Sequence, residues 1–214
     1  MKKVNVDVHK LVQNTYDKIA DKYHERYSEY SEFFLKFSKE FMNLLPKKAR
    51  ILDLGCGSGR DSKFFSEKGY KVTGVDFSEN MLAIAKKVAP KAKFIKQDLR
   101  KIKFLENSFD GVRCSFVLLH LKRNEIPSLL HKIHQILKKN GVLFISTKQG
   151  EGEIVEKESL DQSFEMFETF FQKDELEQLV IDAGFELLLT DLGYDRYEND
   201  EKIIVILAKK ITEL

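Results

Sequence analysis

The stretch Ile51-Leu52-Asp53-Leu54-Gly55-Cys56-Gly57-Ser58-Gly59-Arg60 decides how this chain folds. Its first half is an apolar run interrupted only by Asp53, which predicts a buried strand. Three glycines at alternate positions follow, and a helical pattern begins after Arg60. Glycine lets a backbone approach a ligand closely, and a helix start offers unpaired N–H groups. The stretch predicts either a nucleotide-like binding turn or an ordinary tight turn between strand and helix.

The glycine spacing narrows the kind of ligand. It is G-x-G-x-G, whereas the dinucleotide fingerprint is G-x-G-x-x-G, and Arg60 stands where that fingerprint has its third glycine. Both Arg60 and the acidic Asp53 disfavour a pyrophosphate, while a carboxylate suits a cationic amino-acid group. The stretch resembles the first motif of class I S-adenosylmethionine-dependent methyltransferases. The resemblance implies S-adenosylmethionine as methyl donor, S-adenosylhomocysteine as product, and Asp53, Gly55, Cys56, Gly57 and Gly59 as binding residues.

Length and composition bound the class of protein. The chain has 214 residues, which fits one domain over 1–214, and 36 Lys+Arg against 34 Asp+Glu give a net charge of +2. That balance does not favour nucleic acid as partner. Cys56 and Cys114 form no C-x-x-C pair, so neither a disulfide framework nor a zinc site is expected. His131 and His134 have no third metal ligand nearby in sequence, and we expect no metal.

The ends and apolar runs suggest no membrane partner. No apolar segment follows Lys2 and Lys3, and no apolar run reaches membrane-spanning length. We therefore expect a cytoplasmic protein. The sequence does not predict its oligomeric state.

The first part of the chain predicts a helical cap over residues 1–48. Apolar residues recur at helical spacing over 8–27, and a second helix with an inward phenylalanine stripe is expected over 31–45. The first segment resembles the Y-D-x-x-A-x-x-Y lead-in of the methyltransferases. This implies that Tyr16 and Tyr23 touch the cofactor, although packing of an amphipathic helix would explain both equally well.

A second strand, 70–75, ends in Asp76, nineteen residues after Gly57. A carboxylate there lies at the carboxyl edge of a parallel sheet, where it can accept hydrogen bonds from ribose hydroxyls. The alternative is that Asp76 only caps the next helix, but Ser78 suits that cap better. Phe77 and Met81 are assigned to the same cofactor site.

The third and fourth strands each end in residues to which the resemblance gives a role. The third, 93–97, is followed by Asp98 and Leu99, which the resemblance places at the adenine; Asp98 as a simple turn residue is the alternative. Gln97 is assigned to the same site. The fourth, 109–116, leads into a segment that resembles the S-x-x-L-H-L signature. The resemblance implies that Ser115 and Phe116 lie beside the sulfonium and that His120 faces the acceptor.

His120 is the candidate catalytic residue, because a histidine can remove a proton from an acceptor oxygen or nitrogen. A lone histidine in an apolar run is also often a buried residue with satisfied hydrogen bonds. The following helix is expected over 125–139, with Lys138 to Gly141 as its cationic end. A fifth strand is expected over 142–147.

The last third predicts an insertion and a closing hairpin. Residues 148–172 begin with a polar, acidic, glycine-bearing segment, which reads either as a lid-like insertion or as a solvated loop. After a helix over 173–183, strands over 185–190 and 202–209 are joined by the loop 191–200 and must pair antiparallel. The fold class expected is α/β: a three-layer, doubly wound, Rossmann-like methyltransferase fold whose seven-stranded, mostly parallel sheet ends in an antiparallel hairpin.

The function expected is methyl transfer from S-adenosylmethionine to an oxygen or nitrogen of a small-molecule acceptor. The lead-in and glycine motifs also resemble enzymes that modify wobble uridines in tRNA, so a tRNA acceptor stays open. A non-catalytic S-adenosylmethionine-binding protein and an NAD-dependent oxidoreductase on a similar sheet are the alternatives from other classes.

Overall fold

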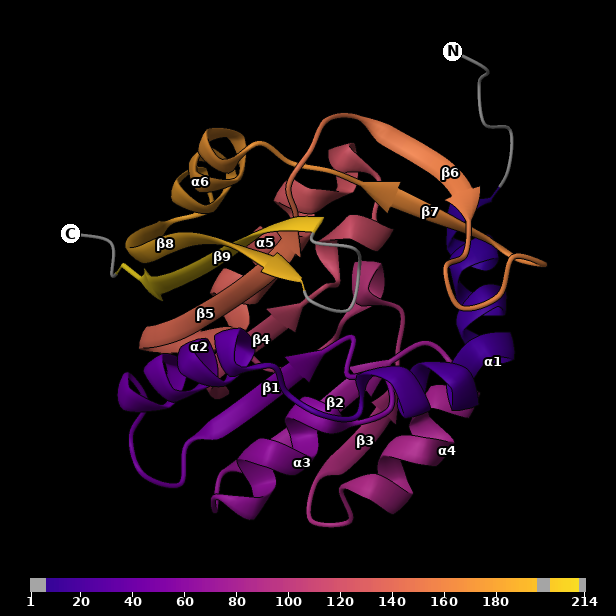
Figure 1. Ribbon diagram of the computed structural model, residues 1–214. Coiled ribbons are helices and arrows are strands. Elements are labelled where there is room, and N and C mark those ends of the chain that lie inside the picture. Colours follow the sequence, from indigo (N-terminus) through magenta and orange to yellow (C-terminus); the bar gives the residue numbers. More distant parts are fainter. Residues whose placement is uncertain (1–6, 196–200, 212–214) are drawn as a thin grey trace.

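The computed structural model describes residues 7–195 and 201–211, and a seven-stranded sheet with helices on both faces dominates it (Figure 1). The spatial order of the strands is β3-β2-β1-β4-β5-β9-β8. The first five are parallel, and β9 pairs antiparallel with both β5 and β8. The strand bounds are β1 Arg50–Leu54, β2 Lys71–Asp76, β3 Lys93–Lys96, β4 Phe109–Ser115, β5 Leu137–Lys148, β8 Phe185–Asp195 and β9 Glu201–Lys210. The predicted fold class is confirmed.

Two hydrophobic clusters fix the helices to opposite faces of the sheet. One joins α5 and α6 to one face, and the other joins α2 and α3 to the opposite face. Successive side chains of β1 point to opposite faces of the sheet, and both faces are apolar. Leu52 packs in the cluster with α5 and α6, and Ile51 packs in the cluster with α2 and α3. The helix bounds are α1 Val8–Tyr27, α2 Glu32–Asn43, α3 Arg60–Glu67, α4 Glu79–Val88, α5 Ile126–Ile136 and α6 Lys173–Asp182, with 3₁₀ turns η1 Leu99–Lys101, η2 Leu118–His120 and η3 Arg123–Glu125.

The helix expected over 125–139 is too long at its C-terminal end. The structure ends α5 at Ile136, and the next residue, Leu137, has extended backbone and pairs with Phe109 of β4. Leu137 is fully buried there, so packing against the sheet outweighs the helix propensity of the lysines that follow. The basic segment is therefore part of β5, with Asn140 in the left-handed region at φ 61°.

The insertion between β5 and α6 is built as a hairpin rather than an irregular loop. Strands β6 Glu153–Lys157 and β7 Glu165–Thr169 pair antiparallel in a separate two-stranded sheet beside α1 (Figure 1). Met166 and Phe167 of β7 are buried against Val8 and Val12 of α1. Strand β6, within the acidic segment, is largely exposed, whereas β7 is buried from Met166 to Thr169.

The last strand pair is longer than the sequence pattern suggests. β8 extends to Asp195, so the first half of the loop expected over 191–200 is strand, and residues 196–200 lie outside the described residues. Across the described ranges, 7–195 and 201–211, no helix combines the length and the apolar character needed to cross a membrane.

Candidate active site

The site lies where the strand order reverses, at the carboxyl ends of β1 and β4. Chain connections leave these adjacent strands toward opposite edges of the sheet, which opens a crevice between them. A first cavity of about 670 Å³, open mouth included, and a larger second cavity adjoin here, with a small third cavity at the glycine turn. This size is that of a small-molecule site.

Most of the residues predicted from sequence line these cavities. Those in the first cavity are Tyr16, Tyr23, Gly55, Gly57, Asp76, Phe77, Met81, Asp98, Leu99, Ser115, Phe116 and His120. Asp53 and Cys56 line the third cavity with Gly55 and Gly57. Gly59 and Gln97 line none of the three.

Gly59 has a packing function in the structure. Its φ of 89° is in the left-handed region, and it precedes the first residue of α3. A Cβ at this position would lie 2.9 Å from the Cα of Ala85 in α4. Gly59 therefore lets α3 and α4 approach each other behind the turn, whereas Gly57 leaves space in front of it.

Asp53 places a buried carboxylate beneath the glycine turn. Its side chain accepts a hydrogen bond of 2.7 Å from the hydroxyl of Ser62 in α3. Burial raises the pKa of Asp53, and the neighbouring carboxylate of Asp61 raises it further. A cationic group in the third cavity would relieve both effects, so the position suits an ammonium group.

Asp76 ties the end of β2 to the glycine turn. One carboxylate oxygen accepts from the backbone N–H of Gly57 and the other from that of Ser78, both at 2.9 Å. Burial raises the pKa of Asp76 to about 6. Ser78, not Asp76, caps α4, since its hydroxyl accepts from the N–H of Met81 at 3.1 Å. A carboxylate offers about four acceptor positions, so Asp76 can still accept from a ligand.

Asp98 has the turn role as well as a place in the cavity. Its side chain accepts from the backbone N–H of Arg100 at the start of η1, and its two oxygens accept from the Arg100 guanidinium at 2.5–3.0 Å. Its neighbour Gln97 points away, accepting from the N–H of Lys103 at 3.4 Å. The adenine role of Asp98 stays a prediction.

Helix α1 lies over the first cavity and is held there by polar contacts. Gln13 donates to the carbonyl of Phe77 at 3.1 Å, and Ser78 donates to Asp17 at 2.6 Å. The rings of Tyr16 and Tyr23 meet edge to face at 5.6 Å. These contacts place both tyrosines between α1 and the sheet edge.

Tyr16 also bonds to the candidate catalytic residue. Its hydroxyl lies 2.6 Å from Nε2 of His120, and Nδ1 of His120 lies 3.1 Å from the carbonyl oxygen of Phe167 in β7. A carbonyl oxygen only accepts, so Nδ1 carries the proton and Nε2 accepts from Tyr16. Burial lowers the pKa of His120 to about 4, so the ring is neutral at neutral pH.

The second cavity contains the residues that sequence reasoning missed. It shares Tyr16, Tyr23, Phe116 and His120 with the first cavity. Its other lining residues include Tyr27, Phe34, Arg60, Lys148, Glu156, Glu158 and Glu168. The position of the insertion after β5 was the one usable signal for the last four, because α/β proteins bind ligands at that sheet edge.

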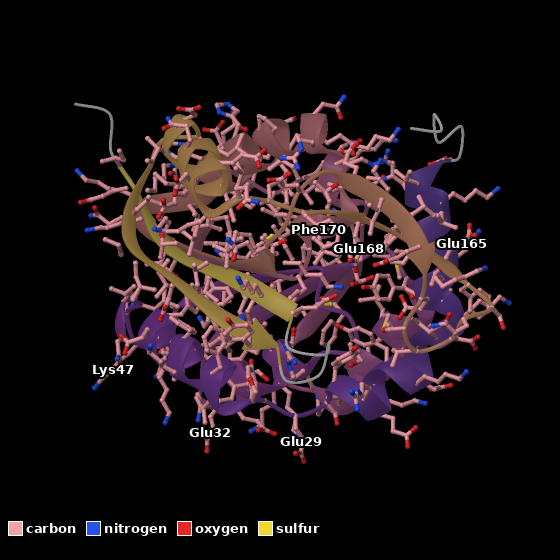
Figure 2. The ribbon with its side chains drawn as sticks, turned by 45° about the horizontal axis from the view of Figure 1, so that its top comes forward. Glu29, Glu32, Lys47, Glu165, Glu168 and Phe170 are labelled. Atoms are coloured by element: carbon pink, nitrogen blue, oxygen red, sulfur yellow. The ribbon has the colours of Figure 1, made fainter. Side chains whose placement is uncertain are left out.

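Lys148 and Glu168 form a buried ion pair in the wall of the second cavity. The ammonium of Lys148 lies 2.9 and 3.0 Å from the two carboxylate oxygens of Glu168. Figure 2 shows Glu168 inside the outline of the molecule and Glu165, on the same strand, at its edge. In the described part of the chain, no group of three His, Cys, Asp or Glu side chains could hold a metal ion.

The fold and the cavities together define an α/β protein with a small-molecule-sized site at its sheet edge. Comparisons with known proteins show which class it resembles. A family profile described as "Methyltransferase domain" matches residues 51–141. Demethylmenaquinone methyltransferase of Renibacterium salmoninarum is 34% identical over 97 residues, 45% of this chain and 40% of that protein. The chain spans about half or less of the curated relatives it matches, with 42%, 52% and 40% of their lengths covered in three of them.

Solved structures match over more of the chain and show the same fold. A SAM-dependent methyltransferase of Methanosarcina mazei has a TM-score of 0.75 at 24% identity, covering 81% of this chain and 98% of that one. The 1,6-didemethyltoxoflavin-N1-methyltransferase of Burkholderia thailandensis, with 1,6-didemethyltoxoflavin and S-adenosylhomocysteine bound, has a TM-score of 0.72 at 21% identity, covering 99% and 94%. The methyltransferase profile, the curated relatives and the solved structures support the predicted resemblance to the class I S-adenosylmethionine-dependent methyltransferases.

Proposed function

We propose that this chain transfers the methyl group of S-adenosylmethionine to an oxygen or nitrogen atom of a small-molecule acceptor. The observation that carries the proposal is that two cavities share one wall, made by Tyr16, Tyr23, Phe116 and His120. The first and third cavities would hold the methyl donor and the second the acceptor. A methyl group passing this wall would travel from one cavity to the other.

The residues around the first and third cavities fit the donor at both ends. Asp53, whose pKa burial raises, suits the positive α-amino group. Asp76 keeps acceptor positions for ribose hydroxyls beside Gly57. The side chains of Met81 and Leu99 give an apolar wall suited to a flat ring.

The chain's own contribution to the reaction is binding and alignment. When bound, the donor supplies an electrophilic methyl group on a good leaving group. Helix α1 closes the first cavity from one side. Tyr16 and Phe116, in the wall shared by the two cavities, exclude water between the two ligands. Positioning of this kind requires few catalytic side chains, which agrees with the scarcity of candidates besides His120.

A small molecule is favoured over tRNA by the charges in the second cavity. Glu156, Glu158 and Glu168 line it. Its cations have carboxylate partners: Lys148 is paired with Glu168, and Arg60 lies 3.1 Å from Asp61. A polyanion would be repelled by these carboxylates rather than attracted.

We also propose that the chain is one methyltransferase domain whose residues 1–48 form a helical cap and whose residues 148–172 act as a lid over the acceptor. The contact between α1 and the β6–β7 hairpin supports both assignments, since both elements cover the wall shared by the two cavities. Thr15 of α1 donates to the carbonyl of Glu165 at 2.8 Å, and Lys22 pairs with Asp161 at 2.7 Å.

Transfer of a radiolabelled methyl group tests the acceptor. The protein is incubated with labelled S-adenosylmethionine and either total tRNA or a metabolite extract. We expect label in the small-molecule fraction only. Label confined to RNA would contradict the small-molecule proposal. S-adenosylhomocysteine binding without transfer to either fraction would point instead to a non-catalytic binding protein.

A further inference from the structure

The hydrogen-bonded pair Tyr16–His120 stands in the wall between the two cavities. Both side chains line the first and the second cavity, although the residues are 104 positions apart in the sequence. Their ring centroids are 5.2 Å apart, edge to face, and the hydroxyl–Nε2 distance is 2.6 Å. An acceptor atom close enough to receive a methyl group through this wall would also be close to Tyr16.

The pair has a fixed direction. Because the carbonyl of Phe167 takes the Nδ1–H of His120, the lone pair of Nε2 accepts the Tyr16 proton. The oxygen of Tyr16 then keeps lone pairs that can accept a hydrogen bond from a ligand. Burial raises the pKa of Tyr16 well above its usual range, so the phenol carries its proton at neutral pH.

A second polar contact in the wall of the second cavity is already occupied within the protein. The carboxylate of Glu168 is held by Lys148, which lies within 3.0 Å of both oxygens and also pairs with Glu201 at 2.9 Å. Burial raises the pKa of Glu168 to about 6. The cavity also has aromatic walls from Tyr23, Phe34 and Phe116, and rings of this kind pack against planar ligands.

From this arrangement we infer that Tyr16 and His120 form a proton relay for an acceptor whose reacting atom is a hydroxyl or a ring N–H on an aromatic compound. The inference rests on the proposed methyl transfer. Tyr16 is the group that touches the acceptor, and His120 acts through it. This assigns Tyr16 to the acceptor, whereas its sequence motif implied a contact with the methyl donor.

The relay balances the reaction. The acceptor atom gains the methyl carbon, and the donor's carbon–sulfur bond breaks with its electron pair left on sulfur. The acceptor's proton passes to the oxygen of Tyr16 while the hydroxyl proton of Tyr16 passes to Nε2 of His120. The resulting imidazolium keeps its Nδ1–H bond to Phe167 and loses a proton to solvent to restore the starting state.

Nitrogen-15 NMR of histidine-labelled protein, saturated with S-adenosylhomocysteine, tests the relay without turnover. We expect His120 as the Nδ1–H tautomer, with an Nε2 signal that shifts when Tyr16→Phe removes the hydroxyl. Adding 4-ethylphenol or benzimidazole is expected to move this signal in the wild type but not in Tyr16→Phe, and 4-ethylanisole, which has no proton to give, is expected to leave it unmoved. An Nε2–H tautomer, or no response to either protic probe, would overturn the inference.

Transfer kinetics give a second test on the same probes. The wild type is expected to methylate 4-ethylphenol or benzimidazole, and Tyr16→Phe to lower kcat about 100-fold with KM little changed. His120→Gln should also lower kcat. The double variant should lose no more kcat than the more damaging of the two single variants, because residues of one relay act as a unit. Tyr70→Phe, whose hydroxyl bonds to the Met42 carbonyl far from the site, is the control. Equal rates in Tyr16→Phe and wild type, or no transfer to either probe, would contradict the relay.

These outcomes are separable from failure of the proposed function. Calorimetric titration of S-adenosylhomocysteine is run on each variant first. Saturable S-adenosylhomocysteine binding by the wild type, whose His120 signal nevertheless does not respond to either protic probe, disproves only the relay. Absent binding in the wild type disproves the methyltransferase proposal.

Discussion

The ion pair between Asp61 and Arg113 is the most deeply buried charge interaction next to the site. Arg113 is fully buried, with its guanidinium 3.8 Å from the ring centre of Phe144. Burial alone would raise the pKa of Asp61, but Arg113 and Arg60 outweigh that and hold it well below its usual range. A depressed pKa means that the stabilisation is present above about pH 4 and is lost as the pH falls.

Substitution of Asp61 should therefore be costly. We expect Asp61→Asn to lower the free energy of unfolding by about 3–5 kcal/mol, because it leaves the Arg113 charge buried without its partner. Urea denaturation at neutral pH measures this. Asp191→Asn, which breaks the exposed pair with Lys36, is the matched control and should cost less than about 1 kcal/mol. Equal losses in the two variants would show that the buried pair has no special weight.

Asp76 should make donor binding dependent on pH. Its pKa is about 6 without ligand, and hydroxyl donors from a ligand favour the ionised form. S-adenosylhomocysteine affinity should therefore rise as the pH increases through about 6, with proton uptake by buffer on binding. In the unliganded protein the sign is opposite: this carboxyl favours folding below about pH 4, and that contribution is lost as the pH rises through about 6.

Asp76→Asn is expected to weaken this affinity by about 1.5–3 kcal/mol and to flatten the pH profile. Calorimetry in buffers of different ionisation enthalpy measures both. Part of the dependence should persist, because burial also raises the pKa of Asp53. An unchanged affinity and profile in Asp76→Asn would remove the ribose assignment.

Sequence patterns located single residues of the site only where a motif marks them. Asp53 and Asp76 follow strand patterns and glycines at readable spacing, and both line the cavities. The bond between Tyr16 and His120 could not be read from sequence, because it depends on how α1 docks across the sheet edge. Gln97 follows the end of β3 and lines none of the three cavities, since its side-chain oxygen accepts from the N–H of Lys103.

Among the elements, the contact between α3 and α4 depends on Gly59. Gly69, just after α3, has the same kind of backbone, with φ of 87°, but no atom lies within 4 Å of its would-be Cβ. A Cβ on Gly59 would lie 2.9 Å from the Cα of Ala85. Substituting alanine at each glycine therefore distinguishes the cost of backbone strain, which both share, from the cost of the steric clash, which only Gly59 has.

We expect Gly69→Ala to cost about 1–2 kcal/mol, the penalty for a left-handed residue with a Cβ. Gly59→Ala should cost about 1–3 kcal/mol more, because α4 must move to admit the methyl group. Urea midpoints of the two variants measure the difference. Equal midpoints would mean that α3 and α4 do not need this close approach.

Element boundaries were predictable where caps and periodicity agree. Ser78 and the apolar face behind it place α4 correctly. The end of α5 was not predictable, because the burial of Leu137 against β4 is a tertiary effect. The β6–β7 hairpin was missed for the same reason: its partner surface is α1, about 150 residues earlier in the chain.

At the scale of the whole molecule, the arrangement of the sheet could be predicted almost entirely from sequence. Alternating strand and helix patterns predict the parallel part, and two strands joined without a helix predict the antiparallel pair β8–β9. The acceptor cavity could not be predicted, because α1, the β4 edge and the insertion build it jointly. Sequence motifs therefore predict residues of the methyl-donor cavity, whereas the acceptor cavity can be recognised only in the tertiary structure.

The central claim is that the crevice between β1 and β4 binds an amino-acid nucleoside rather than a dinucleotide. Calorimetric titration of the wild-type protein with S-adenosylhomocysteine and, separately, with NAD tests it most directly. We predict saturable binding of one S-adenosylhomocysteine per chain and no measurable binding of NAD. Saturable NAD binding with none of S-adenosylhomocysteine would contradict the account.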